Sequence, residues 1–176
     1  SRMGGYCYFN NAAIAAEYLS TRGKVAILDI DVHHGNGTQN IFYSRSDVLF
    51  VSIHGNPDEL YPYFSGRDGE MGTGKGLGYN CNFPLPLGTS DIAYDRALLA
   101  GIKKIRAYAP KYLIISLGYD AHINDPIGKF KLSTDYYFRA AGLINSLHLP
   151  TALIQEGGYN TKTLGVVARR FVEGFC

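Results

Sequence analysis

The chain has 176 residues, of which 46% are hydrophobic and 18% are charged, as in an ordinary folded globular domain. Its formal net charge is +2, and its lysines and arginines are scattered along the sequence, which argues against a nucleic-acid partner. No apolar run approaches the length of a membrane span, and residues 1–8 lack a signal-peptide pattern, so neither a membrane anchor nor secretion is expected.

From the amino terminus, the first predicted element is a helix over residues 10–20, where apolar residues recur at helical spacing. Short apolar segments rich in branched residues predict buried strands at residues 24–31, 48–54, 112–118 and 151–156. Further helices are predicted at residues 91–108, at residues 133–147 and from residue 160 onward. Because these strands alternate with helices, we expect an α/β fold with a parallel sheet sandwiched by helices.

The stretch from residue 55 to residue 88 differs in composition from the rest. It contains a run of closely spaced glycines between Gly66 and Gly78, with prolines on either side. A loop of this length inside a compact domain is usually functional or mobile. No internal repeat and no linker is visible, so we treat residues 1–176 as a single domain.

The three cysteines, Cys7, Cys81 and Cys176, lie far apart and form no C-x-x-C pair. Reduced thiols explain this pattern better than a disulfide framework or a thiolate metal site. We therefore expect a cytoplasmic protein.

The strongest chemical signal is the sequence D-I-D-V-H-H-G-N-G-T at residues 29–38. Asp29, Asp31 and His33 alternate, so in an extended segment they point to one side, at the carboxyl end of a predicted strand. Two carboxylates and an imidazole crowded together would repel and desolvate one another unless a cation joins them. The pattern therefore favours a metal site. The alternative is that Asp29 and Asp31 only cap the next helix.

Two other predicted strands end in residues with chemical potential. Asp120 follows the strand at residues 112–118 and is followed by an Asp125-Pro126 pair, so it can lie beside Asp31 or simply form a turn. The last strand runs into Gly157, Gly158 and Tyr159, where paired glycines permit close backbone approach. The Tyr159 phenol could donate a hydrogen bond to a developing oxyanion, or it could only pack on the rim of the sheet.

These strand ends, together with G-G-Y-C-Y-F-N-N at residues 4–11, resemble the histone deacetylase and acetylpolyamine amidohydrolase superfamily over nearly the whole chain. The resemblance implies an arginase-like, deacetylase-like α/β fold, here incomplete. The sequences D-A-H-x-x-D-P from residue 120 and E-G-G-Y from residue 156 are similar to those of the bacterial amidohydrolases and the class II deacetylases. The segment H-G-N-P-D-E-L-Y-P-Y-F-S-G at residues 54–66 resembles the acetylpolyamine branch.

The resemblance also implies roles for individual residues. Asp31, His33 and Asp120 match the metal ligands, and Tyr159 matches the tyrosine that stabilises the transition state. A carboxylate–imidazole set of this kind suits Zn²⁺, and it also suits Fe²⁺. The metal would acidify a bound water and polarise the amide carbonyl, while a histidine would move protons to the leaving amine.

Asp29, Ser52 and Ile53 match positions that support a catalytic histidine and hold a structural monovalent cation such as K⁺. Tyr6 matches one wall of an acyl-chain tunnel, and either Phe64 or Tyr61 would be the facing wall. Gly157 and Gly158 are expected beside that tunnel.

Acidic residues of the glycine-rich segment could attract a polycationic substrate, or they could simply be solvated; they are Asp58, Glu59, Asp68 and Glu70. The expected substrate is therefore a small acetylated amine such as an acetylpolyamine, with acetyl-lysine as the other choice. Assembly into a homo-oligomer stays open.

The sequence departs from the family at one point. The resemblance expects a pair of proton-transferring histidines a few residues before Gly4, whereas this sequence starts at Ser1. We therefore expect a truncated domain that binds metal but hydrolyses acetyl amides poorly. The alternatives are a non-catalytic remnant that binds metal or ligand, and a ureohydrolase, which would need a second set of metal ligands.

Overall fold

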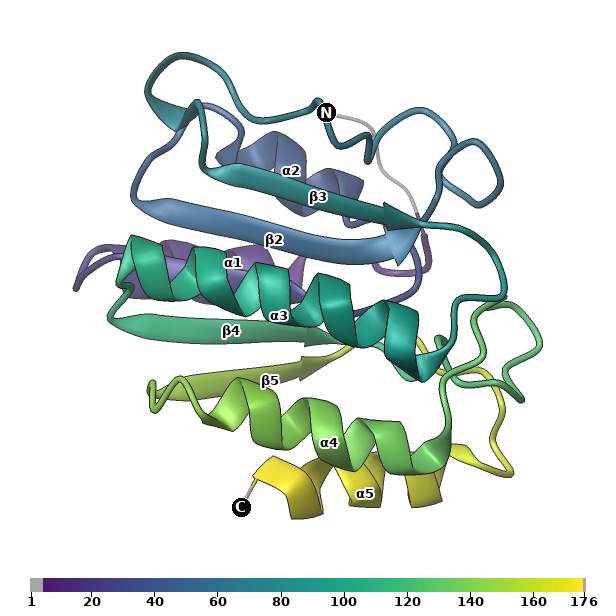
Figure 1. The fold of residues 1–176 in the computed structure, drawn as a ribbon. Coiled ribbons are helices and arrows are strands. Elements are labelled where there is room, and N and C mark those ends of the chain that lie inside the picture. Colours follow the sequence, from purple (N-terminus) through teal and green to yellow (C-terminus); the bar gives the residue numbers. More distant parts are fainter. Residues whose placement is uncertain (1–4, 176) are drawn as a thin grey trace.

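The computed structural model describes residues 5–175, so Gly4 of the amino-terminal motif and Cys176 lie outside the described part of the chain. Within that part, parallel strands form one sheet in the order β3-β2-β1-β4-β5 (Figure 1). The strands are β1 (Val25–Asp29), β2 (Val48–Gly55), β3 (Asn80–Leu85), β4 (Tyr112–Leu117) and β5 (Thr151–Gln155). The predicted parallel α/β architecture is confirmed.

Helices cover both faces of this sheet. In Figure 1, α1 (Asn11–Ser20) and α2 (Asn36–Phe42) lie behind it, and α3 (Asp91–Tyr108), α4 (Thr134–Asn145) and α5 (Leu164–Phe175) lie in front. Alternate strand residues serve the two layers: Ile27 packs with the α1 and α2 side, and Leu28 packs with the α3 to α5 side. Among the described residues, no helix is long and apolar enough to cross a membrane.

The helix boundaries follow capping residues in the sequence. Asn10 caps α1 by accepting a hydrogen bond from the Ala13 N–H, and Ser133 caps α4 through the Tyr136 N–H. The helix predicted at residues 91–108 is observed with those limits, while the last helix begins at Leu164, four residues later than expected. The predicted helices are therefore present, with shifts at their ends.

The prediction of an uninterrupted loop over residues 55–88 is wrong, because β3 and a short 3-10 helix (Gly74–Gly76) lie inside it. β3 pairs with β2 alone and forms one edge of the sheet. An edge strand tolerates Pro84, which has no N–H to donate, and the polar residues Asn80 and Asn82. These same residues made the segment look like a loop.

Two further expectations need correction. The segment at residues 151–156 was expected to be buried, yet β5 is the other edge strand and its Leu153 is 39% exposed. An apolar run does not distinguish an interior strand from an edge strand. The short helix α2 was not among the predicted helices, because its sequence N-G-T-Q-N-I-F has no apolar periodicity.

Candidate metal centre

The carboxyl ends of the parallel strands meet at one edge of the sheet, to the right in Figure 1. Asp31 follows β1 and Asp120 follows β4, and these two strands are neighbours. His33 joins them: its Nδ1 lies 3.0 Å from Asp31 Oδ1 and 3.1 Å from Asp120 Oδ2. One ligand atom from each residue lies within 4.8 Å of the others.

The chain after β1 is bent rather than extended, which differs from the expected geometry for Asp29, Asp31 and His33. The Asp31 N–H donates to Asp29 Oδ1, and the His33 N–H donates to Asp31 Oδ1. These two tight turns bring Asp31 and His33 together. They leave Asp29 outside the group of three residues that could share an ion.

Backbone groups orient both ligand carboxylates. The Gly157 N–H donates to Asp31 Oδ2 over 2.9 Å, and the Val32 N–H donates to Asp120 Oδ1 over 2.9 Å. Gly157 can approach this closely because it has no Cβ; a Cβ there would overlap the Asp31 and Asp120 carboxylates. The turn after β5 therefore closes over the two acids.

Charge in this cluster is unbalanced without a cation. Burial and the charge of Asp31 raise the pKa of Asp120 to about 7. Burial alone would lower the pKa of His33, but its hydrogen bonds to Asp120 and Asp31 raise that pKa to about 10. Burial acts to raise the pKa of Asp31 as well, yet His33 holds it below its usual value. With no cation bound, the two acids therefore hold a proton on His33, and a bound metal would displace that proton.

The donor set fits a divalent metal. Ligand atoms about 2.0–2.1 Å from a tetrahedral zinc ion lie roughly 3.3 Å apart, close to the observed separations around His33 Nδ1. Two oxygens and one nitrogen leave a coordination position open for water, as in hydrolytic sites. The geometry therefore favours the metal-ligand interpretation of Asp31, His33 and Asp120.

The capping alternative for the first motif is not what the structure shows. The N-cap of α2 is Gly35, and no side chain caps it. Asp29 is buried and lies beside Ser52, its register partner on β2. Burial and the charge of Asp31 raise the pKa of Asp29 well above its usual value. Ile53 follows Ser52 on β2, with its side chain in the core beneath α3.

Tyr159 lies beside the triad, on the turn closed by Gly157. Its ring contacts the ring of Tyr6 edge to face, with the centroids 5.7 Å apart. Burial raises the pKa of Tyr159, and the nearby charges of Asp31 and Asp120 raise it further. The phenol therefore remains protonated and can donate a hydrogen bond. Gly158 follows Gly157 with a φ of +135°, which allows the turn.

Of the two residues expected to form the facing tunnel wall, Tyr61 lies at the triad and Phe64 is exposed. The Tyr61 ring faces the His33 ring at 6.4 Å, and its hydroxyl accepts the Gly5 N–H. Tyr61 therefore lies beside His33, and Tyr6, from a different segment, lies beside Tyr159. Phe64, three residues after Tyr61, is 46% exposed.

Three of the four acids of the glycine-rich segment have partners within the described part of the chain. Asp58 pairs with Arg67, and Glu59 accepts the Leu87 N–H. Glu70 turns inward, where its carboxylate accepts the Gly66 N–H.

A buried amide holds this segment against the sheet. Gln39 Oε1 accepts hydrogen bonds from Asn80 Nδ2, Asn82 Nδ2 and the His34 ring, and Gln39 Nε2 donates to Glu70. We call these five residues the Gln39 network. It joins α2 and β3 to the residue 56–79 segment.

A second contact supports the same segment from β2. His54 lies 4.6 Å from His34 between ring centroids, and its Nε2–H donates to the carbonyl of Gly66. The Ser52 hydroxyl donates to the other nitrogen of His54. Burial lowers the pKa of His34 to about 4 and that of His54 to about 3, so both rings are neutral.

Two parts of this region carried little signal in the sequence. Gln39 lies in a seven-residue helix without apolar periodicity, and only its contacts reveal its place. Asp125 was visible as an Asp-Pro pair after Asp120, yet nothing in the sequence connected it to Tyr159. The structure does so, because the Tyr159 N–H donates to Asp125 Oδ2 over 2.8 Å.

Comparisons with known proteins identify the family of this chain. A family model described as histone deacetylase domain matches residues 1–175. Acetylpolyamine amidohydrolase 2 of Pseudomonas aeruginosa is 51% identical over 175 residues, covering 98% of this chain and 51% of that protein. A crystal structure of acetylpolyamine aminohydrolase from Burkholderia pseudomallei has a TM-score of 0.96 and 48% identity, covering 98% of this chain and 51% of that one. The chain thus spans about half the length of the curated relatives it matches.

Proposed function

This chain belongs to the histone deacetylase family, and we propose that it forms the metal centre of an amide hydrolase that removes acetyl groups from acetylated amines. The resemblance expected from the strand-end motifs is confirmed, as is the deacetylase-like fold. The convergence of Asp31, His33 and Asp120 at one sheet edge carries the proposal.

We assign the three ligand positions to Zn²⁺, with Fe²⁺ as the alternative that the same donors accept. When bound, such a cation lowers the pKa of water and polarises an amide carbonyl. Asp31, His33 and Asp120 would hold it. The buried Asp29, with Ser52 and Ile53, would hold a structural K⁺, since a hydroxyl that donates to His54 keeps lone pairs for a cation.

Aromatic residues would take two further roles. The Tyr159 hydroxyl would donate a hydrogen bond to the oxyanion as the amide carbonyl becomes tetrahedral, because its raised pKa keeps the phenol protonated. Tyr6 and Tyr61, whose rings contact Tyr159 and His33, would flank the acyl chain and keep water from it. Phe64 would extend the wall on the Tyr61 side.

Proton transfer to the leaving amine needs another group. The chain has five histidines, and beyond His33 none bonds to the triad in the described residues. His34, His54 and His122 use their ring nitrogens elsewhere, and His148 lies before β5, at the opposite edge of the sheet. We therefore propose that these 176 residues alone bind metal but deacetylate slowly.

The same observation favours a second candidate function, a non-catalytic module that binds metal or an acylated amine. A ureohydrolase has less support, since two metal ions need more acid and histidine ligands than the one cluster found in the described residues.

The relatives named acetylpolyamine amidohydrolases favour a small acetylated polyamine over acetyl-lysine in a protein. A cytoplasmic location agrees with the free thiols of Cys7 and Cys81. We expect no nucleic-acid partner.

The test measures metal content and acetate release for this chain and for the complete product of its gene. The substrates are acetylputrescine, acetylspermidine and an acetyl-lysine peptide, each with zinc present. We expect about one zinc ion per chain in both proteins, and the fastest turnover on the acetylpolyamines by the complete product.

Tyr159→Phe in the complete product should keep its zinc and lose roughly 100- to 1000-fold in kcat. Tyr8→Phe is the matched control, because Tyr8 is exposed and makes no contact with the triad. Absence of bound metal from both proteins would contradict the metal centre, and full activity of the 176-residue chain would contradict the need for a further histidine.

A further inference from the structure

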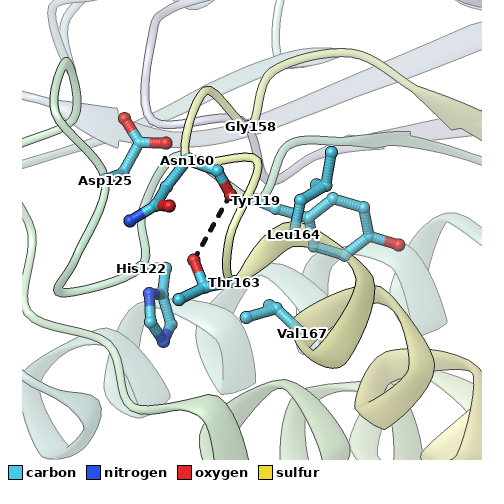
Figure 2. Close-up of a pocket in the computed structure, with 8 residues that line it drawn as sticks. All are labelled: Tyr119, His122, Asp125, Gly158, Asn160, Thr163, Leu164 and Val167. Carbon is cyan, nitrogen blue, oxygen red and sulfur yellow. Dashed lines mark hydrogen bonds between the residues drawn. The ribbon is translucent and has the colours of Figure 1, made fainter.

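The turn that carries Tyr159 spans a small pocket. Figure 2 shows the pocket below this turn, with walls from the loop after β4, from the turn itself and from the start of α5. On its outer side the Tyr159 ring contacts Tyr6, which is itself 78% exposed. Packing therefore supports the turn over only part of its surface, so hydrogen bonds also contribute to its position.

The ends of the turn are fixed by residues on either side of Tyr159. Gly157 is held at its carbonyl by the Tyr119 N–H. Asn160 donates its side-chain amide to the carbonyl of Asn124 over 2.7 Å. Tyr159 lies between these anchors, and its own N–H donates to Asp125.

The Asp125 carboxylate serves two segments at once. Its Oδ1 accepts the N–H groups of Ile127 and Gly128, at 2.9 and 3.0 Å, which closes the turn after Pro126. Its Oδ2 accepts the Tyr159 N–H at 2.8 Å, across 34 residues of sequence. Asp125 is 9% exposed, so these charge-assisted bonds are shielded from water.

The turn built by Asp125 also touches the metal ligand. Gly128 packs directly on the backbone of Asp120, where a Cβ would overlap the Asp120 carbonyl. Asp125 therefore connects two elements that must keep a fixed separation, the ligand Asp120 and the phenol-bearing residue Tyr159.

A purely local role would be to stabilise the Asp-Pro turn. That role accounts for the bonds to Ile127 and Gly128, but the local turn does not require the bond from Tyr159. We propose that Asp125 is a positioning residue, which fixes the Tyr159 phenol relative to the metal site through the Tyr159 backbone. This inference rests on the role proposed above for Tyr159.

Asp125→Asn separates the two roles. The asparagine oxygen can still accept from Ile127 and Gly128, but its NH₂ group then faces the Tyr159 N–H, donor against donor. The local turn is kept and the long-range bond is lost. Asp91→Asn is the matched control, because the Asp91 carboxylate also bridges two segments, through Ser133, without contacting the Tyr159 turn.

The first measurement is amide hydrogen exchange in the zinc-loaded chain, which needs no catalytic activity. Asp125→Asn should speed exchange of the Tyr159 amide by roughly 10- to 100-fold, the equivalent of one charge-assisted hydrogen bond. Asp91→Asn should leave it unchanged, and zinc content should stay the same in both. Unchanged exchange of the Tyr159 amide in Asp125→Asn overturns the proposal.

The second measurement uses the complete gene product on acetylputrescine. Asp125→Asn should lower kcat by about 10-fold or more with KM nearly unchanged, since Tyr159 acts in the transition state. In a Tyr159→Phe background the same change should cost less than about 2-fold. An equal loss in both backgrounds overturns the proposal. Absence of turnover in every variant would instead count against the proposed function, and the exchange result would still decide the bond.

Discussion

Two groups of loops meet at the carboxyl edge of the sheet and are fastened in different ways. The turns after β1, β4 and β5 hold one another through bonds between neighbours, such as Gly157 to Asp31 and Val32 to Asp120. The residue 56–79 segment follows β2 but supplies none of the three triad residues. It is held by the hydrogen bonds of the Gln39 network and by the hydrogen bond from His54 to Gly66.

This difference separates two tasks. The short turns fix the proposed metal ligands through hydrogen bonds from backbone groups that lie directly beside the ligand carboxylates. The residue 56–79 segment places Tyr61 near His33, and it is held by hydrogen bonds that involve side chains of α2, β2 and β3. Binding of the ion and shaping of the substrate entrance are therefore expected to respond to different substitutions.

The largest effect is expected at the triad. Asp120→Asn should weaken zinc binding by more than about 100-fold, since it removes a charged ligand while the Val32 N–H keeps an acceptor. Competition against a coloured chelator measures the change. Asp95→Asn, which alters a carboxylate paired with Arg139 on the outer helices, is the control. Hydrogen exchange in residues 56–79 should be unaffected. A general increase in exchange there would show that the short turns and the residue 56–79 segment do not respond independently.

A smaller effect is expected from the residue 56–79 segment. Gln39→Leu should lower the free energy of unfolding by about 2–4 kcal/mol, because it strands buried donors on Asn80, Asn82 and His34. Denaturant melts measure that loss, and exchange should speed in residues 56–79. Zinc affinity should change less than about 3-fold once the chain is folded.

Asp58→Asn is the control in the same segment. It breaks only the exposed ion pair with Arg67, so its cost should stay below about 0.5 kcal/mol. A loss of zinc affinity in Gln39→Leu as large as that in Asp120→Asn would show that the two regions are not independent.

The smallest effect is a pH dependence. Burial lowers the pKa of His54 to about 3, against about 6.5 in an unfolded chain. Below pH 6.5 the unfolded state binds the extra proton, so stability falls as pH decreases toward 3. At pH 5 this one residue should cost about 2 kcal/mol.

His54→Gln tests that dependence, because glutamine can still donate to Gly66 but does not titrate. Both proteins are compared without metal, by denaturant melts from pH 7 to pH 4. The wild type should lose more stability than the variant over this range. Parallel curves would show that His54 is not the group that titrates.

The same contrast explains what could be predicted from the sequence. The triad could be predicted because Asp31, His33 and Asp120 each follow an apolar strand, and parallel strands bring their carboxyl ends together. Those signals are local. The Gln39 network was missed because its members lie on a short polar helix, a polar edge strand and a glycine-rich loop, none of which has a periodic pattern.

Orientation was harder to predict than location. The turn with Tyr159 was expected at the sheet edge, but its link to Asp125 spans 34 residues and depends on how two loops fold back. Glu70 was expected either to attract a polycationic substrate or to be solvated, and its bond to the Gly66 N–H could not be read from the sequence. Such pairings arise only once the chain is compact, when buried donors must find acceptors.

The Asp31 and Asp120 carboxylates accept hydrogen bonds from three peptide N–H groups, those of Val32, His33 and Gly157. In the described residues, their other hydrogen bonds come from triad side chains. A peptide group is the same whatever side chain its residue carries, so most single substitutions cannot remove these donors. The ion site is in this sense robust to mutation in its surroundings. Its weak point is Gly157, where even a methyl group would displace both acids. Changes in metal binding are therefore expected mainly from substitution of Asp31, His33 or Asp120 themselves, and from Gly157, rather than from the other residues whose peptide groups orient the acids.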